Sequence, residues 1–412
     1  MTTAHGSVAA RLIEFFGLRR SIVGLLGMVI LVGMGEKMAE RFLPLYLLAL
    51  GGGALSVGAL NGLDNLLSAL YSFPGGYAAD RLGTKRALLL FNLVAMAGFV
   101  VVILVPRWEA VLAGSVLFLS WTAISLPATM ALVARALPPR KRTMGVTMHS
   151  LVRRVPMALG PIVGGACIGT WGVEKGVRVA FAAALAMAVL AAVLQQRLIE
   201  DDRPEAAKLG RSAVLAEKNP MRLFRQMPAA LRHLLISDIL IRFCEQIPYA
   251  FVVVWATREV HSPVSEFEFG LLTAVEMVTA MLIYIPVAWL ADRSTKKPFV
   301  LITFVNFTLF PLALLFAQSF WPLVGAFVLR GLKEFGEPTR KALIMDLAPE
   351  DRKAATFGLY YLIRDVVVSV AAFGGAFLWM KGPAVNFLAA FACGLAGTLW
   401  FAWRGRDLGP IE

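Results

Sequence analysis

The sequence is dominated by apolar runs that are each long enough to cross a lipid bilayer. A membrane-spanning helix needs about 20 mainly apolar residues, because the hydrocarbon core is about 30 Å thick. About twelve runs meet this length, namely residues 21–49, 56–79, 86–106, 110–133, 144–170, 178–196, 231–256, 267–291, 298–317, 321–346, 355–380 and 384–403. The chain is therefore predicted to be an all-α integral membrane protein with twelve transmembrane helices.

The charge composition also indicates a membrane protein. Only 16% of the residues are charged and 58% are hydrophobic, whereas soluble domains average about 25% charged residues. The net charge is +13, but the basic residues lie in the loops rather than in a patch with interleaved aromatic residues. This distribution indicates contact with anionic membrane lipid and argues against binding of nucleic acid.

Motifs for covalent, metal or nucleotide chemistry are absent from the sequence. Cys167, Cys244 and Cys393 lie in apolar runs without a C-x-x-C pair, so we expect packing residues rather than a disulfide or a metal site. No G-x-S-x-G, H-E-x-x-H or phosphate-binding glycine loop appears. We therefore expect neither an enzyme, nor a cofactor, nor a bound metal.

The loops between the apolar runs alternate in charge. Loops at one end are richer in Lys and Arg, at residues 81–86, 135–142, 293–297 and 350–353. The positive-inside rule places such loops in the cytoplasm. Both termini are thus expected to be cytoplasmic, in a protein of the bacterial inner membrane.

A long polar segment of mixed charge divides the chain at residues 197–230. Its length and composition predict a cytoplasmic linker between an N-terminal six-helix half (1–196) and a C-terminal six-helix half (231–412). The two halves are related in sequence, because a shift of about 212 positions takes Asp64 to Glu276 and a shift of about 211 takes Pro127 to Pro338. Such an internal duplication is the parallel repeat found in some transporter folds.

Two compact charged turns occupy equivalent places in the halves. The first, at 76–86, contains Gly76, Asp80, Arg81, Gly83 and Arg86. The second, at 288–297, repeats the acid and base as Asp292 and Arg293 and lacks the glycines. Glycines permit the tight turn, and the basic residues mark a cytoplasmic connection.

This pair of turns resembles the major facilitator superfamily, in which a G-x-x-x-D-R-x-G-R/K-R/K turn joins helices two and three and a degraded copy joins helices eight and nine. The order and spacing of the apolar runs extend the resemblance over nearly the whole chain. It implies twelve helices in two pseudo-symmetric halves, a small-molecule substrate, a monomer, and a gating role for the two turns.

Ionisable residues at membrane depth are costly, so they are expected to face the protein interior or water and to serve function. The proton-coupling candidates are Glu36, Glu40, Asp64, Glu276, Glu334 and Glu337. The substrate-cavity candidates are Lys37, Arg153, Arg154, Asp238, Arg242, Glu245, Arg330, Lys333, Arg364 and Asp365. For each of these residues the alternative is structural pairing with a neighbour.

Two pairs of acids stand out among the proton-coupling candidates. Glu36 and Glu40 are like charges one helical turn apart, which favours protonation of one of them. Asp64 and Glu276 have no base one turn away, so each is expected to hold a proton or to pair across the seam between the halves. The resemblance places helices two and eleven, and five and eight, at that seam, which predicts Arg364 for Asp64 and Arg153 or Arg154 for Glu276.

Helix five carries Gly160, Pro161, Gly164 and Gly165, a glycine-rich proline segment that permits close packing. It resembles the helix-five signature of proton-driven exporters, although Pro156 stands where that signature usually has glycine. The predicted function is secondary active transport of a small solute by alternating access, most favourably proton-coupled efflux by antiport. The alternative is proton-coupled uptake or exchange of an organic anion, and a remote alternative is a non-transporting receptor with a transporter fold.

The resemblance generates a test of the first charged turn. Asp80→Asn is expected to leave expression and ligand binding near normal but to slow the exchange between inward-open and outward-open forms, because the turn acts between helices and away from the substrate. The exchange rate is measured by fluorescence or crosslinking of paired labels. Normal transport by the variant would contradict the gating role.

Overall fold

The computed structural model is helical throughout the part of the chain that it describes, which is residues 20–119, 121, 125, 139–199, 224, 225, 227–291, 295–348 and 353–406. The helices of the first half are α2 (Arg20–Glu40), α3 (Leu43–Ala49), α4 (Gly53–Leu82), α5 (Thr84–Leu104), α6 (Trp108–Phe118) and α8 (Pro139–Leu198). Those of the second half are α11 (Ala229–Tyr249), α12 (Val252–Val254), the π-helix η2 (Trp255–Glu259), α13 (Glu266–Ala291), α14 (Lys297–Phe316), α15 (Phe320–Leu332), α16 (Glu337–Leu347), α17 (Lys353–Met380) and α18 (Pro383–Arg404). These residues contain no strand, which confirms the all-α prediction.

The twelve predicted spans map in order onto the described helices, of which α6 covers only part of the fourth. α8 accounts for the fifth and sixth spans, because Gly172 interrupts it with a backbone φ of 75°. The first and tenth spans each consist of two consecutive pieces, α2 with α3 and α15 with α16, and the seventh consists of three, α11 with α12 and η2. The predicted twelve-helix fold in two halves is confirmed, whereas the linker at 197–230 lies largely outside the described residues.

Few of the described helices could cross a membrane as single, uninterrupted apolar segments. Five have the length and hydropathy to do so, and a sixth results if the pair Ala229–Tyr249 and Val252–Glu259, which is bent by 44°, counts as one span. Several of the other spans are broken into shorter helices or carry charged residues in their middle. The interruptions within these spans are a feature of the fold that the search for apolar runs of about 20 residues did not predict.

Prolines lie at each of the three interrupted spans. Pro44 stands in the first turn of α3 and Pro338 in the first turn of α16, where a missing N–H is tolerated. Pro248 lies in the last turn of α11, just before the bend. Because proline cannot donate to the carbonyl four residues earlier, each proline favours an interruption of the helix within its span.

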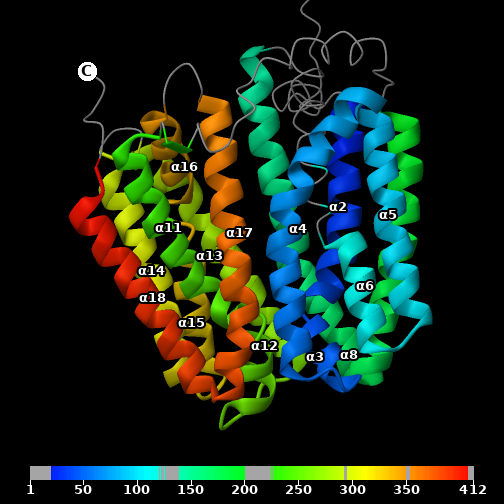
Figure 1. Cartoon of the computed structure of the whole chain (residues 1–412). Helices are drawn as coiled ribbons and strands as arrows, with labels where there is room; N and C mark the ends of the chain where they lie inside the picture. The colour runs from blue at the N-terminus through cyan, green and yellow to red at the C-terminus, as the bar shows by residue number, and fades with distance from the viewer. Residues whose placement is uncertain are drawn as a thin grey trace, which may run out of the picture.

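The two halves lie side by side and meet along two helix pairs. α4 packs along α17, and α8 packs along α13, as Figure 1 shows for α4 and α17 at the centre of the view. Glycines allow close approach at both contacts: a β-carbon on Gly58 would meet Ala376 Cβ at 2.5 Å, and one on Gly270 would meet the Pro161 carbonyl oxygen at 2.5 Å. The halves are thus in direct backbone contact near the end of the bundle where α4 begins.

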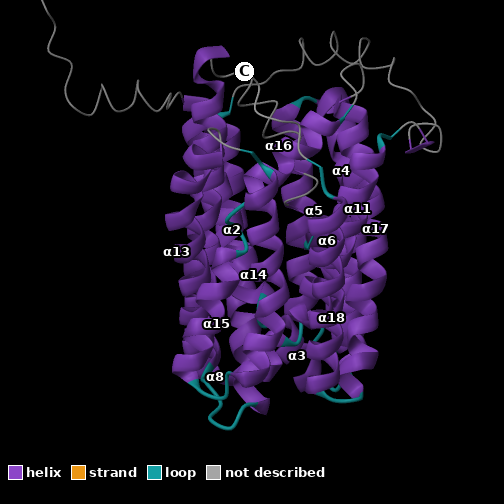
Figure 2. Cartoon of the chain, turned by 90° about the vertical axis from the view of Figure 1, so that its left-hand side faces the viewer, coloured by secondary structure: helices purple, strands orange, loops and turns teal. Residues whose placement is uncertain are grey.

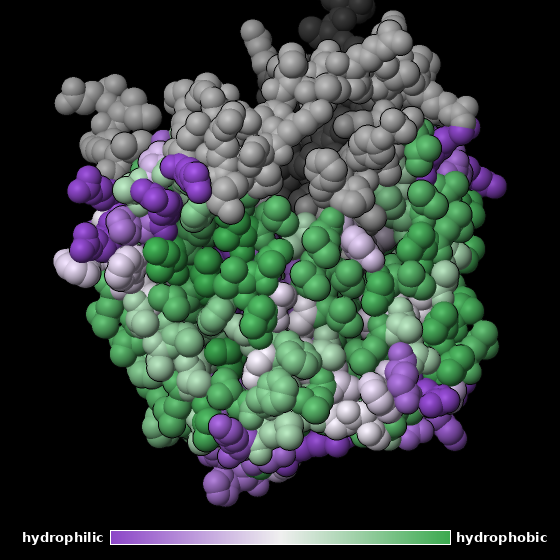
Figure 3. Space-filling view, viewed as in Figure 1, coloured by the Kyte–Doolittle hydropathy of each residue, from purple (hydrophilic) through white to green (hydrophobic). Residues whose placement is uncertain are grey.

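The outside of the bundle has the character of a lipid-facing surface. The long helices run side by side along one axis (Figure 2), and a broad apolar band lies between hydrophilic ends (Figure 3). Exposed apolar side chains on α5, α14 and α18 include Leu104, Phe316 and Leu399. These helices carry no charged residue in their central turns, as expected for the third, ninth and twelfth spans facing lipid.

The glycines of the fifth span, in the first part of α8, contact α2 of the same half and α13 of the other half. A β-carbon on Gly160 would meet Lys37 Cβ at 2.7 Å, and one on Gly164 would overlap the carbonyl oxygen of Met38, so both glycines lie against α2. A β-carbon on Gly165 would overlap the carbonyl oxygen of Glu266 at the start of α13, in the other half. Gly165 therefore lies directly on the seam.

The seam contact can be tested with a matched pair of glycine variants. Gly165→Val is expected to destabilise the protein by about 1–3 kcal/mol, the usual cost of overpacking, because the new side chain would collide with Glu266. Gly169→Val, one turn later on the same helix, is the control, since nothing lies within 4 Å of its β-carbon position. Denaturant unfolding in detergent measures both, and equal losses would show that helix propensity rather than the seam is responsible.

Candidate functional site

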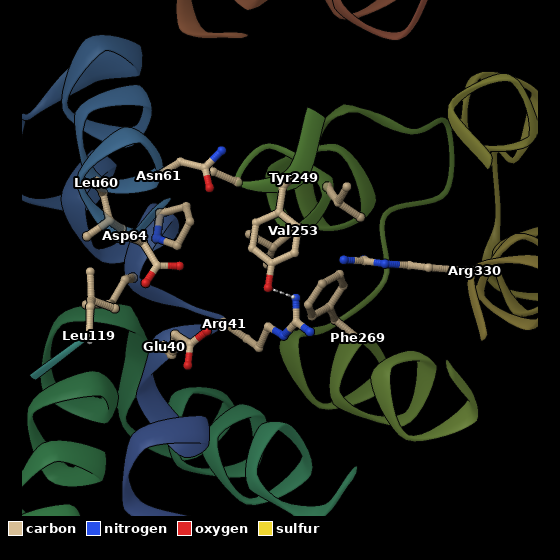
Figure 4. Close-up of a pocket in the computed structure, with 14 residues that line it drawn as sticks. Glu40, Arg41, Leu60, Asn61, Asp64, Leu119, Tyr249, Val253, Phe269 and Arg330 are labelled. Atoms are coloured by element: carbon tan, nitrogen blue, oxygen red, sulfur yellow. Dashed lines mark hydrogen bonds between the residues drawn. The ribbon is translucent and has the colours of Figure 1, made fainter. Parts of the chain in front are cut away.

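A cavity of about 500 Å³ lies between the two halves. Its wall comes from both halves: Glu40, Arg41, Leu43, Pro44, Leu60, Asn61, Asp64 and Leu119 from the first, and Tyr249, Ala250, Val252, Val253, Phe269 and Arg330 from the second. Figure 4 shows Asp64 and Glu40 on one side, Arg330 on the other, and Arg41 and Tyr249 between them.

The cavity lies where helices are interrupted. Arg41 stands at the break between α2 and α3, Tyr249 ends α11, and Ala250 lies in the gap before α12. Arg330 is in the last turn of α15, just before the tenth span breaks. Discontinuous helices at the interface of two repeats are a recurring construction of substrate sites in transporters. The prolines that interrupt these helices therefore help to form the cavity.

One hydrogen bond joins the two sides of the cavity. Arg41 Nη1 donates to Tyr249 Oη at 2.8 Å, and the Arg41 guanidinium carbon lies 5.1 Å from the centre of the same ring. Arg330 approaches that ring as well, at 5.4 Å. Tyr249 therefore lies against two guanidinium groups that come from opposite halves, a favourable arrangement for cation–π attraction.

Three further polar contacts between described residues cross the seam, one of which is a hydrogen bond donated by Asn65 Nδ2 to Gln246 Oε1 at 3.2 Å. Asn61 Nδ2 donates to the backbone carbonyl of Gln246 at 2.9 Å. Arg154 forms an ion pair of 3.1 Å with Glu334, and it lies closer than the seam glycines to the Pro139 end of α8. The halves are thus connected by polar contacts beside the cavity and by backbone contacts at the end where α4 begins.

The second half contains a continuous network of buried ion pairs. Glu276 Oε1 lies 3.2 Å from Arg330 Nε and 3.4 Å from Lys333 Nζ, and Lys333 Nζ also lies 2.7 Å from Glu245 Oε1. Glu245 in turn pairs with Arg242 at 2.6 Å. Each charge has an opposite neighbour, which removes most of the cost of burying it.

The network continues from Arg242 on α11 toward α17, the eleventh span. Arg242 reaches Glu337 at 3.3 Å, Glu337 pairs with Arg340 at 2.6 Å, and Arg340 pairs with Asp238. At this end of the network, Asp238 also accepts a hydrogen bond from Tyr360 Oη at 3.1 Å and pairs with Arg364 at 3.4 Å. Arg364 in turn pairs with Asp365 at 2.7 Å. The substrate-cavity candidates of the second half are therefore mostly engaged with one another.

The predicted ion pairs across the seam are wrong. Glu276 pairs with Arg330 and Lys333 of its own half, and not with Arg153 or Arg154. Arg364 pairs with Asp238 and Asp365, and not with Asp64. The physical reason is that α13 also packs against α15 within the half, which brings Arg330 and Lys333 to Glu276, while Arg154 pairs across the seam with Glu334 instead.

Asp64 is left without a partner among the described residues. No base lies within 4.0 Å of its carboxylate, and none of the described hydrogen bonds involves its side chain. The duplication explains this, because a shift of about 211 positions places Leu119 at the position equivalent to Arg330. Leu119 lines the cavity with Asp64, so Glu276 has a guanidinium at a place where Asp64 has an aliphatic side chain.

The two acids of the first span, Glu36 and Glu40 on α2, share a single lysine. Lys37 Nζ lies 3.3 Å from Glu36 Oε1 and also pairs with Glu40. The predicted crowding of the two carboxylates is thus relieved by a base between them. Of the three side chains, only Glu40 lines the cavity.

The remaining predicted residues lie away from the cavity or beyond the described part. Arg153 is half-buried on α8, next to Arg154. Gly83 has a φ of 82° at the start of α5 and Arg86 is exposed. The side chains of Asp80 and Arg81, and the backbone around Gly76, fall in a part of α4 without described side chains, and Asp292 and Arg293 lie outside the described residues. The gating role of these turns stays a prediction.

Sequence reasoning missed several residues of the site. Arg41, Asn61, Leu119, Tyr249 and Phe269 line the cavity but were not among the predicted site residues. A signal existed for two of them, because Arg41 and Tyr249 each lie within three residues of a proline, inside a predicted span that also carries charged residues. Nothing in the sequence pattern marks the others.

Two related helical halves with a charged cavity at their seam define a membrane transport protein. The sequence profile of the Major Facilitator Superfamily matches residues 25–262 and 234–411. The chain belongs to the Major Facilitator Superfamily, and it is an integral membrane transporter of that family.

Individual relatives agree with this assignment. An uncharacterized MFS-type transporter of Methanocaldococcus jannaschii is 22% identical over 364 residues, which cover 86% of this chain and 87% of the relative. Among solved structures, a peptide transporter POT variant in complex with alafosfalin has a TM-score of 0.75 at 17% identity, with 94% of each chain covered. The nucleoside transporter NupG has a TM-score of 0.74 at 14% identity, covering 93% of this chain and 100% of its own.

A bacterial homologue of the human lysosomal transporter Spinster, in an inward-facing and unoccupied conformation, has a TM-score of 0.67 at 15% identity, with 93% and 95% covered. These structures transport different molecules on one fold. The likeness therefore establishes the architecture, and the substrate has to be argued from the cavity of this chain.

The ion network generates a stability prediction. Arg340→Gln is expected to lower the free energy of unfolding by about 3–5 kcal/mol, because Asp238, which is 1% exposed, loses its main base inside the protein. Lys341→Gln on the same helix is the control, since Lys341 is 52% exposed and lies 3.7 Å from Glu337. That change should cost about 0–1 kcal/mol. Denaturant titration in detergent compares them, and a similar cost for both would argue against the network.

Proposed function

We propose that this protein is a proton-coupled secondary transporter that moves a small solute by alternating access, with Asp64 as the coupling carboxylate. The observation that carries the proposal is the contrast among the six acidic candidates. Five have a base as an ion-pair partner, namely Glu36 and Glu40 with Lys37, Glu276 with Arg330, Glu334 with Arg154, and Glu337 with Arg340. Asp64 has none among the described residues, and it lines the cavity.

An isolated carboxylate at membrane depth costs roughly 3 kcal/mol on insertion scales. Asp64 reduces this cost by holding a proton or by binding a cationic group of a solute. The two occupants exclude each other at one carboxylate, so release of one accompanies binding of the other. This competition is sufficient to exchange protons for solute as the halves alternate.

The direction of transport that we propose is efflux by antiport. It is supported by the resemblance of Gly160, Pro161, Gly164 and Gly165 to the helix-five signature of exporters. We also propose a monomer in the bacterial inner membrane with both termini in the cytoplasm, on the grounds of the basic loops at one end of the bundle.

A second candidate function is the uptake or exchange of an organic anion. It is favoured by Arg41, which lines the cavity and donates a hydrogen bond to the Tyr249 hydroxyl rather than to a carboxylate. Under this alternative the anion binds at Arg41, and Asp64 carries a proton in the same direction.

The test is transport by purified protein in proteoliposomes, screened by counterflow against cationic, neutral and anionic solutes. Asp64→Asn is expected to abolish accumulation driven by a pH gradient, because the proton and the cationic group of the solute both bind at this carboxylate. Exchange of solute at equal pH and saturating solute concentration is expected to persist, with weaker apparent affinity, through the remaining cavity contacts. Glu109→Gln, at an exposed ion pair with Arg107, is the control. Undiminished pH-driven accumulation by Asp64→Asn would move the coupling role to another acid.

A further inference from the structure

We propose that the cavity binds a zwitterion, whose cationic group pairs with Asp64 and whose anionic group pairs with Arg41. The inference rests on the proposed function only in taking this cavity as the transport site. It combines two observations that each of the candidate functions used separately. Both charges line one cavity, and neither has an opposite charge as a partner among the described residues.

Arg41 has unused capacity to bind an anion. Its guanidinium uses one N–H to donate to Tyr249 Oη at 2.8 Å, whereas a guanidinium carries five N–H donors in a planar fork. The neighbouring acid, Glu40, is engaged by Lys37. A carboxylate or a similar oxyanion is the group that such a fork binds best, through two parallel hydrogen bonds.

Tyr249 keeps the two charges of the cavity apart. It belongs to the second half, and its hydroxyl and ring hold the Arg41 guanidinium, while Asp64 belongs to α4 of the first half. Figure 4 shows Arg41 directed toward Tyr249 rather than toward Asp64. No contact within 4.0 Å joins Asp64 to Arg41, so the two charges stay available to a molecule that reaches both.

The other charges of the cavity do not alter this balance. Arg330 is 3% exposed and is neutralised by Glu276 at 3.2 Å. Among its described residues the cavity therefore presents one cation, Arg41, and one anion, Asp64, that have no ion-pair partner within 4.0 Å. A solute with a single charge would leave one of them without a directly contacting opposite charge, whereas a zwitterion supplies a partner to both.

The space between the charges favours an apolar body. Leu60, Leu119, Val253 and Phe269 line the same cavity, and Figure 4 shows them around the charged groups. These side chains offer no hydrogen bonds to a polar linker. The substrate class is thus a small amphipathic molecule with an ammonium group, an oxyanion and an aliphatic or aromatic body.

The experiment uses matched probes that differ only in charge, applied to the full-length protein in detergent at neutral and equal pH. One set is phenylalanine, phenethylamine and 3-phenylpropionate, and the other is leucine, isopentylamine and 4-methylpentanoate. Affinity is measured by calorimetry and by thermal stabilisation. In at least one set the zwitterion is expected to bind roughly 10- to 100-fold more tightly than either single-charge analogue, as for the loss of one charged hydrogen-bond partner.

Two variants should change this preference in opposite ways. Asp64→Asn removes the site for the ammonium group, so the zwitterion is expected to lose its advantage over the acid. Arg41→Gln removes the site for the oxyanion, so the zwitterion is expected to lose its advantage over the amine. Glu109→Gln is the control, and a melting curve checks that each variant is folded.

Tyr249→Phe tests the positioning role of the hydroxyl. Without it Arg41 is free to move toward Asp64, so affinity for the zwitterion should fall while the melting temperature stays close to that of the parent. A fall in the ratio of zwitterion affinity to single-charge affinity, without a fall in melting temperature, distinguishes a positioning role from a purely structural one.

Three results would overturn the proposal. They are equal or tighter binding by a single-charge analogue in both sets, no binding by either zwitterion, and parallel rather than opposite changes in the Asp64 and Arg41 variants. The outcomes also separate this inference from the proposed function. Zwitterion selectivity without proton coupling would contradict the function alone, and coupling with a singly charged solute would contradict the inference alone.

Discussion

The cost of placing charge at membrane depth is the constraint on which this structure depends. An ionised group that leaves water must find an opposite charge or a proton. In the second half the requirement is met by a continuous network that runs from Arg330 at the cavity, through Glu276, to Asp365 on α17. Because its ion pairs connect α11, α13, α15, α16 and α17, the network restrains the relative positions of these helices, and this half is expected to move as one body.

The described residues of the first half form a smaller ion-pair cluster, made of Glu36, Lys37 and Glu40. Glu276 and Asp64 stand at equivalent positions, but the base that serves Glu276 is replaced by Leu119 in the first half. One difference at a repeated position thus separates an acid with an ion-pair partner from an acid without one among the described residues. Asymmetry between halves of common origin therefore points to the positions at which function can be tested.

The sequence predicts the architecture well because the bilayer fixes the length of an apolar run. The eighth span was predicted at 267–291 and the helix is Glu266–Ala291, and the twelfth was predicted at 384–403 and the helix is Pro383–Arg404. The breaks inside the first, seventh and tenth spans were not predicted, because hydropathy averages over them. Ion-pair partners such as Arg330 and Glu276 were not predictable either. They depend on how each helix is rotated about its axis, and neighbours on a single helix carry no such information.

The ion pair between Arg154 and Glu334 has a consequence for the energetics of opening. It is a direct charged contact between the halves, and its side chains are 17% and 23% exposed. Water and salt therefore reach it more readily than they reach Asp238 and Arg340, which are each 1% exposed. Screening by mobile ions weakens a partly exposed pair far more than a buried one. The ionic strength of the solution that reaches this pair thus sets part of the energy needed to separate the halves, while the internal cohesion of the second half stays unaffected.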